Sequence, residues 1–253
     1  ENHLNIENYT DYILTQIYIA NTSYQHNILA WRKTNKNSGY EWLIKDLDRG
    51  FDSHNSSHNG SWRSIFQAIY DVDPILNKLL LNTNYKNFFL QRLYSHINVS
   101  FNSIYINSVL DSLISNIQNE MPNHIDRWSF SGGIQSLDQW DAKLQSIRNF
   151  SNQRKDTLIN RLIDFFNLEG RINVNLQTNS YKGGKVYIAG IEIPLNNPNL
   201  TYFKNIPVEF IAKPNLGYSF AGWENISTND TVSLTFNKDI IIKALFTLDG
   251  YNY

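Results

Sequence analysis

The hydrophobic period of the chain changes once, at Arg171, and this change sets the class of fold. Before it, apolar residues recur every three or four positions, which is the spacing of an amphipathic helix. After it, apolar residues such as Ile172, Val174 and Leu176 alternate with polar ones, which is the spacing of a half-buried strand. The sequence therefore predicts an α+β protein, with a mainly helical domain at residues 1–169 and a small antiparallel all-β domain at residues 171–248.

Helical spacing predicts helices at residues 8–20, 74–81, 84–97, 103–119 and 139–167. Two short apolar arms, residues 28–32 and 42–45, flank a turn-rich tip and predict a hairpin. Between the later helices we expect Trp128 to pack in the core, with Arg127 bonded to carbonyls or a carboxylate. We expect Arg154 to have the same scaffold role, with Asp126 as a candidate partner.

Oxygen-bearing side chains stand at the outer ends of both arms of the predicted hairpin. Asn27 precedes the first arm, and Asp46 and Asp48 follow the second. An Asp-x-Asp pair at a strand end would place both carboxylates on the same side of the pleat, because alternate residues face the same way. Two like charges held together favour a cation between them, and Mg²⁺ prefers oxygen ligands. The alternative is a plain exit from the strand, since Asp and Gly both favour turns.

The composition excludes several classes of function. The chain has no cysteine, which rules out disulfides, zinc-thiolate sites and cysteine nucleophiles. Its formal net charge of −1 argues against a nucleic-acid partner held through phosphates. No apolar run has the length of a membrane span and no signal peptide opens the sequence, so the signal of a secreted protein would lie outside it.

Residues 21–51 also resemble the core signature of the CotH (spore coat protein H) kinase-like family. The resemblance rests on NTSYQHNILAWR and YEWLIKDLDRGFD, continues through NTNYKNFFLQR and PNHIDRW, and covers residues 7–168 in order. It implies a mainly helical protein-kinase-like C-lobe with a metal-site hairpin, and the phosphorylation of secreted proteins with ATP and a divalent metal. The chain would then act at the bacterial cell surface or outside the cell, with an exported or surface protein as substrate or binding partner.

The resemblance also assigns roles to individual residues. Asn27 is similar to the metal-binding Asn of a kinase catalytic loop, and Asp46 or Asp48 is similar to the metal-binding Asp that opens Asp-Phe-Gly. Asp48 is the closer match, because Arg49 and Gly50 follow it. Asn27, Asp46 and Asp48 are therefore the expected catalytic, metal and cofactor-binding residues, with Mg²⁺ and ATP as the expected cofactors.

The sequence departs from the family pattern at the catalytic Asp, which would fall at Thr22, or at Ser23 after a one-residue deletion. Neither hydroxyl accepts a proton as a carboxylate does. No glycine-rich strand pair and no phosphate-pairing Lys precede the loop, so we expect a C-lobe that is either a fragment or has lost its nucleotide clamp. Two hypotheses stay open: an ATP-dependent protein phosphotransferase, and a non-catalytic cell-surface binding or assembly module.

The predicted β-domain contains the segment PVEFIAKPNLGYSFAGWE, which resembles the repeat-like β-modules of bacterial cell-surface proteins. We expect Trp223 to fill the core rather than to stack on a sugar, because a small β-domain needs large apolar residues to be stable. The domain is expected to act as a spacer or to bind a partner.

Overall fold

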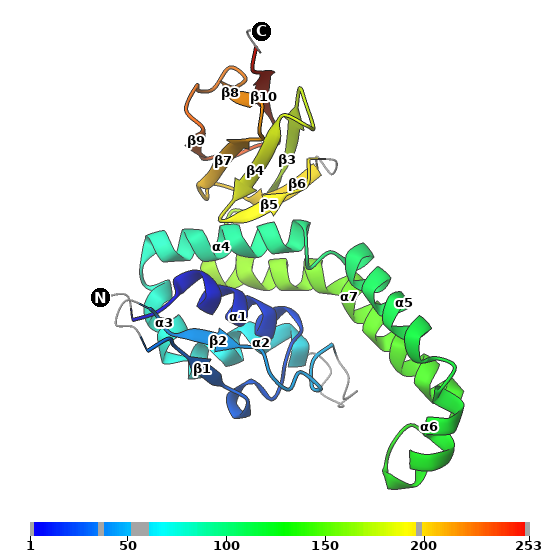
Figure 1. Cartoon of the computed structure of the whole chain (residues 1–253). Coiled ribbons are helices and arrows are strands. Elements are labelled where there is room, and N and C mark those ends of the chain that lie inside the picture. The colour runs from blue at the N-terminus through cyan, green and yellow to red at the C-terminus, as the bar shows by residue number, and fades with distance from the viewer. Residues whose placement is uncertain (1–2, 35–37, 52–60, 196–198, 251–253) are drawn as a thin grey trace. The chain divides into compact units, whose positions relative to one another are not determined.

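The computed structural model describes residues 3–34, 38–51, 61–195 and 199–250, without the side chains of residues 61–64 and 131. The chain divides into two compact units, residues 1–77 with 101–161 and residues 78–100 with 162–253 (Figure 1). Helices dominate the first unit and strands the second, which confirms the predicted α+β class. Among the described residues, none of the helices combines the length and the apolar character of a bilayer span.

The first unit contains most of the helices and a two-stranded sheet. Its elements are α1 (Ile6–Tyr18), η1 (Tyr24–His26), β1 (Leu29–Trp31), β2 (Glu41–Leu43), α2 (Ser61–Val72), α3 (Pro74–Leu80), α5 (Ser103–Ile117), α6 (Met121–Trp128), η2 (Ser129–Ser131) and α7 (Leu137–Phe166). Helices α3 and α7 continue into the second unit. The hairpin and the helices predicted in this part of the chain are all found, with small shifts at their ends.

Helix α1 lies at the core of the first unit. Asn5 caps it by accepting a hydrogen bond at Oδ1 from the amide of Asn8 (3.1 Å). Tyr9 and Ile13, whose four-residue spacing predicts the helix, are fully buried. The β1–β2 hairpin contacts α1 through Trp42, whose ring lies edge-on to that of Tyr9 with 4.9 Å between centroids.

Arg154, on the distant helix α7, also packs into this core. Its side chain is fully buried and donates hydrogen bonds to the carbonyls of Tyr18 (2.7 Å from Nε) and Ile17 at the end of α1. Neither carbonyl receives a hydrogen bond from the amide four residues on, and among the described residues only that of Ile17 has a backbone donor, the amide of Ala20 (3.2 Å). The predicted scaffold role of Arg154 is therefore confirmed, with carbonyls as its partners.

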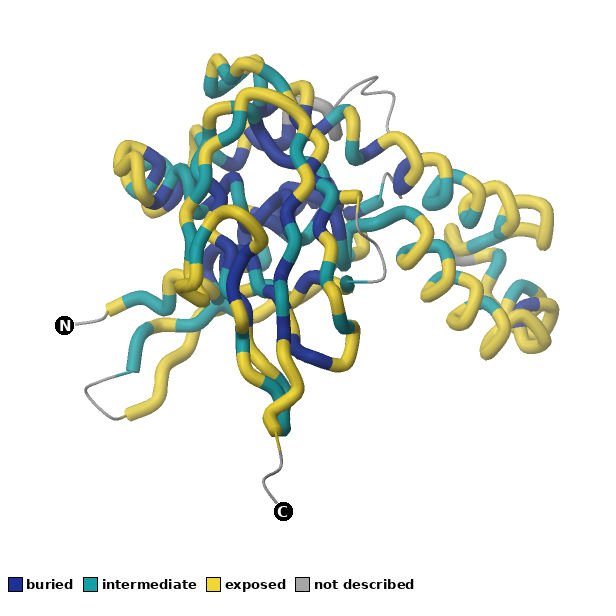
Figure 2. Tube along the Cα trace, turned by 90° about the horizontal axis from the view of Figure 1, so that it is seen from above, coloured by how far each residue is buried: buried dark blue, intermediate teal, exposed yellow. Residues whose placement is uncertain are grey.

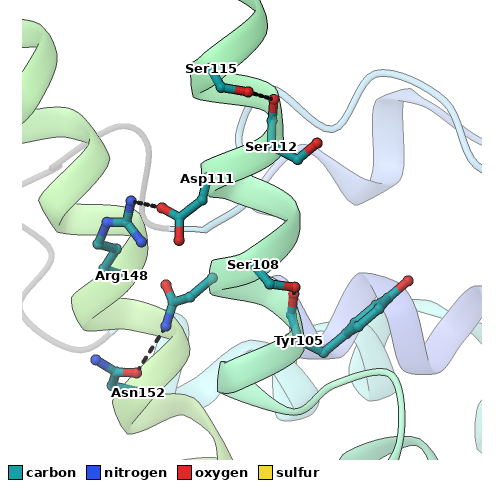
Figure 3. A network of polar contacts seen from close by, with 8 residues as sticks. Tyr105, Ser108, Asp111, Ser112, Ser115, Arg148 and Asn152 are labelled. Carbon is teal, nitrogen blue, oxygen red and sulfur yellow. Dashed lines mark hydrogen bonds and ion pairs between the residues drawn. The ribbon is translucent and has the colours of Figure 1, made fainter.

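Helix α5 forms as predicted, but its apolar stripe is not buried. No residue of this helix is buried (Figure 2). Leu113 is 57% exposed. The helix is held to α7 by polar contacts, an ion pair between Arg148 and Asp111 and a hydrogen bond from Asn107 Nδ2 to Asn152 Oδ1 of 3.3 Å (Figure 3). Periodicity predicts a helix, but it does not say what covers the apolar face.

The prediction of a core position for Trp128 was wrong. Trp128 ends the short helix α6 and is 46% exposed, and the guanidinium of Arg127 lies 5.0 Å from the centroid of its ring. Only Met121 of this helix is buried. A helix of this length reaches the core with few side chains, so the aromatic residue at its end stays at the surface.

The second unit contains α4 and two four-stranded sheets. Its elements are α4 (Thr83–Asn98), β3 (Arg171–Thr178), β4 (Gly184–Ile188), β5 (Ile191–Ile193), β6 (Asn199–Phe203), β7 (Val208–Pro214), β8 (Tyr218–Trp223), β9 (Thr231–Leu234) and β10 (Ile240–Leu248). The strand orders are β6-β3-β10-β8 and β5-β4-β7-β9. Strand β10 runs parallel to β3, so the first sheet is mixed, whereas a purely antiparallel domain was predicted. Alternation reveals which face of a strand is buried but not the direction in which the strand runs.

The core of the β-rich unit is apolar and tightly packed. Trp223 is buried, and its ring lies edge-on to those of Phe210 (5.9 Å) and Phe220 (5.5 Å), which confirms its predicted core position. Strand β4 approaches β10 so closely that a Cβ on Gly184 would lie 2.2 Å from the ring of Phe246. Glycine is therefore required at this position.

Helix α4 packs on the strands of the second unit. Arg92 is buried and donates a hydrogen bond to the carbonyl of Ala189 in the turn after β4. The ring of Tyr94 lies edge-on to that of Phe203 with 4.4 Å between centroids. Helix α4 thus groups with the strands, although α5, α6 and α7 lie between them in the sequence.

Candidate functional site

A chain of side-chain hydrogen bonds runs along the segment from Ala20 to Asn27. The segment leaves α1 through Ala20, which has a positive φ of 55°. The fully buried Asn21 accepts hydrogen bonds at Oδ1 from the amide (3.0 Å) and hydroxyl (3.2 Å) of Ser23. It donates from Nδ2 to Gln16 (2.8 Å). Ser23 Oγ in turn accepts a hydrogen bond from Asn27 Nδ2 (3.2 Å). The orientation of the Asn27 amide is therefore set by residues on the same segment.

The second acidic segment is not the end of a strand. Strand β2 stops at Leu43, and Asp46 adopts a left-handed conformation with φ of 54°. Asp48 and Arg49 form a turn. The argument that the pleat places both carboxylates on the same side therefore does not apply, because regular alternation has ended before Asp46. Both Asp side chains are exposed.

Backbone hydrogen bonds join the two segments. The amide of Phe51 donates to the carbonyl of Ile19 (2.7 Å), and the amide of Thr22 donates to the carbonyl of Arg49 (3.5 Å). Gly50, which lies between these contacts, packs closely against Ile19. A Cβ at Gly50 would lie 3.0 Å from the Ile19 side chain. The turn that carries Asp48 is thus fixed against the segment that leads to Asn27.

The donor atoms of the three predicted site residues suit a hard cation. Because Asn27 Nδ2 donates to Ser23, its Oδ1 is the atom able to bind a metal, and no hydrogen bond to this oxygen is found among the described residues. Asp46 and Asp48 add exposed carboxylates, which are ligands that Mg²⁺ accepts together with water and phosphate oxygens. Among the described residues, no group of three or more His, Cys, Asp or Glu side chains could hold a metal.

An exposed apolar face lies next to these oxygen donors in sequence. Leu29 of β1 pairs with Leu43 of β2, so their side chains lie on one face of the hairpin, and Trp31 shares this face. Their exposed fractions are 46%, 43% and 40%. Trp42, on the opposite face, packs on α1. The hairpin therefore exposes an apolar face on the strands that follow Asn27 and precede Asp46 in the sequence.

A buried carboxylate that the sequence analysis did not identify lies beneath this region. Asp73 is only 8% exposed and accepts hydrogen bonds from the phenols of Tyr9 (2.7 Å, at Oδ1) and Tyr24 (at Oδ2). Burial, and then the hydrogen bond and charge of Asp73, raise the pKa of the Tyr24 phenol above its ordinary value. The Asp-Pro step at the start of α3 is a recognisable cap signal, but nothing in the sequence pairs Asp73 with tyrosines far away in the chain.

The two stretches that carry the kinase-like resemblance, residues 19–27 and 46–51, are thus joined by backbone hydrogen bonds in the helical unit. The sequence matches the family described as CotH kinase protein over residues 1–158, and the chain belongs to this family. Its function is therefore kinase-related. No curated protein and no solved structure matches the chain. The β-rich part of the second unit lies beyond the matched residues.

Proposed function

We propose that the first unit binds Mg²⁺ and ATP at Asn27, Asp46 and Asp48, and that it transfers phosphate poorly or not at all. The observation that carries this proposal is the pair of backbone hydrogen bonds joining Ile19 to Phe51 and Thr22 to Arg49. They hold the two segments that bear the oxygen donors against each other. Such a fixed frame lowers the cost of bringing ligands together around a cation.

Each of the three residues has a distinct part in this proposal. Asn27 offers its Oδ1, oriented by Ser23, and Asp48 offers a carboxylate from a turn fixed by Gly50. Asp46 lies on the less regular stretch after β2 and completes the set. A bound Mg²⁺ would neutralise the phosphate charges of the nucleotide. The apolar face of Leu29 and Leu43 suits the flat ring of the base.

Weak or absent phosphate transfer follows from Ser23. A carboxylate at this position would be placed to accept the proton of an attacking hydroxyl, whereas a serine hydroxyl cannot do so near neutral pH. We therefore favour a nucleotide-binding pseudokinase that works as a binding or assembly module for an exported or surface protein, at the bacterial surface or outside the cell. The β-rich strands then act as a surface module or spacer. An active phosphotransferase remains the second candidate, which the sequence favours only through family membership.

The test is calorimetric titration of the chain with ATP, with and without Mg²⁺. We expect binding that requires Mg²⁺ and that weakens roughly tenfold or more in Asp48→Ala, the loss typical for a removed metal ligand or its close partner. Asp141→Ala is the matched control, because Asp141 is also exposed and lies on α7, outside the proposed site. Comparison with Asp46→Ala shows which Asp contributes more. Absence of Mg²⁺-dependent binding by the unaltered chain contradicts the proposal.

A further inference from the structure

Asp73 lies where three parts of the first unit meet. It joins α2 to α3, Tyr9 reaches it from α1, and Tyr24 reaches it from η1. The amides of Ile75 (2.9 Å) and Leu76 (2.9 Å) also donate to it. A carboxylate that is nearly inaccessible to water must obtain its hydrogen bonds from the protein.

The two oxygens of this carboxylate are bonded differently. Oδ1 accepts from Tyr9, Ile75 and Leu76, whereas the donor found for Oδ2 among the described residues is Tyr24. Loss of the Tyr24 hydroxyl would therefore leave a buried charged oxygen without its donor. Loss of the Tyr9 hydroxyl would leave two other donors on the oxygen that it serves.

Tyr24 belongs to the segment that presents Asn27. The amide of Asn27 donates to the carbonyl of Tyr24 (3.4 Å), and the amide of His26 donates to the carbonyl of Ser23 (3.0 Å). The single turn η1 has no side-chain cap at Ser23, so local bonds alone hold it weakly. The phenol of Tyr24 is thus an anchor that ties this short turn to the interior.

We propose that Asp73 is a positioning residue that fixes the Asn27 segment through Tyr24, and that it sets the affinity of the site for the metal-nucleotide complex without touching it. The effect on affinity rests on the proposed function. The effect on the order of residues 22–28 does not, because it follows from the Tyr24 anchor alone.

The test compares Tyr24→Phe with Tyr9→Phe. Each substitution removes one hydroxyl from the same carboxylate, but only the first removes a bond to the Asn27 segment. In the protein without ligand, we expect the amides of residues 22–28 to exchange with deuterium about tenfold faster in Tyr24→Phe and at the normal rate in Tyr9→Phe. We also expect Tyr24→Phe, but not Tyr9→Phe, to weaken Mg²⁺-dependent ATP binding roughly 10- to 100-fold.

Thermal unfolding of both variants separates positioning from general stability. Tyr24→Phe should lower Tm more than Tyr9→Phe, because Oδ2 loses its donor whereas Oδ1 keeps two. The inference is supported when the faster exchange is confined to residues 22–28 and both exchange and affinity change only in Tyr24→Phe. Equal exchange at residues 22–28 in both variants overturns it. Asp73→Asn, which keeps the side-chain shape and removes the charge, serves if Tyr24→Phe does not fold, and we expect the same faster exchange. If the unaltered chain does not bind Mg²⁺ and ATP, the proposed function fails while the exchange data still decide the role of Asp73.

Discussion

Arg154 places a charge in a part of the first unit that water does not reach. Burial lowers the pKa of its guanidinium to about 9, so the group remains charged near neutral pH. The two carbonyls that it binds are at the end of α1, where they lack the amide donor four residues on and where a cation is favoured. One side chain thus satisfies the terminus of the helix from which the Asn27 segment departs.

Replacing Arg154 should destabilise the protein far more than replacing Arg148 on the same helix. Arg154→Met removes two hydrogen bonds from a buried charged donor and leaves Ile17 with the amide of Ala20 as a donor, so we expect the free energy of unfolding to fall by about 2 to 6 kcal/mol. Arg148→Met removes an ion pair with Asp111, whose side chain is 63% exposed, and should cost less than about 1 kcal/mol. Urea unfolding followed by circular dichroism measures both. Equal losses would mean that the carbonyl contacts of Arg154 add little.

Ser23 is, with Thr22, one of the two positions at which the resemblance to kinases places the missing catalytic carboxylate. It is only 9% exposed, and its Oγ lies 3.2 Å from Asn27 Nδ2, whereas Thr22 is exposed. We expect Ser23→Asp to raise ATP-dependent phosphate transfer by about 10²- to 10⁴-fold, the usual contribution of a general base, and Thr22→Asp to have no such effect. Transfer of labelled phosphate from ATP to the protein itself or to a surface protein measures this. The same low rate for both variants would count against the assignment of position 23.

Among the elements, those with strong local signals could be predicted from the sequence. The four-residue spacing of Tyr9 and Ile13 predicts α1, and alternation at Ile172 and Val174 predicts β3, because each pattern records which side of the element is buried. The hairpin was also predictable, since a polar tip separates two apolar arms. The three site residues named from this stretch stay predictions.

Other features depend on contacts between distant parts of the chain and leave no local pattern. Asp46 adopts a left-handed conformation that ends the strand alternation early. Asp73 is paired with tyrosines from α1 and η1, and β10 pairs with β3 across the whole β-rich segment. Helix α5 shows the converse. Its apolar residues recur with a clear helical period, yet Leu113 among them is exposed in the structure. A periodic pattern predicts the helix but does not show which surface, if any, covers its apolar face.

At the scale of the whole molecule, the change of hydrophobic period at Arg171 does not coincide with the division into compact units. Helix α4 lies within residues 78–100 and groups with the strands, although the CotH match includes it. The first unit ends at Arg161, close to the end of the match at residue 158. The hydrophobic period shows where helices give way to strands along the sequence. The compact units are instead defined by which elements pack together.

This grouping predicts that a change in α4 will loosen the strands. Arg92→Met removes the hydrogen bond to the carbonyl of Ala189 and the contact with the ring of Phe88, which lies 5.6 Å from the guanidinium carbon. We expect a loss of about 1 to 3 kcal/mol, seen as faster deuterium exchange in β4 and β5 of the full chain with α1 unchanged. Lys86→Met is the control, because it removes a charge from the same helix and no bond from Lys86 to the strands is found among the described residues. Faster exchange in α1 with the strands unaffected would place α4 with the helical unit instead, because local opening follows the unit to which an element is bound.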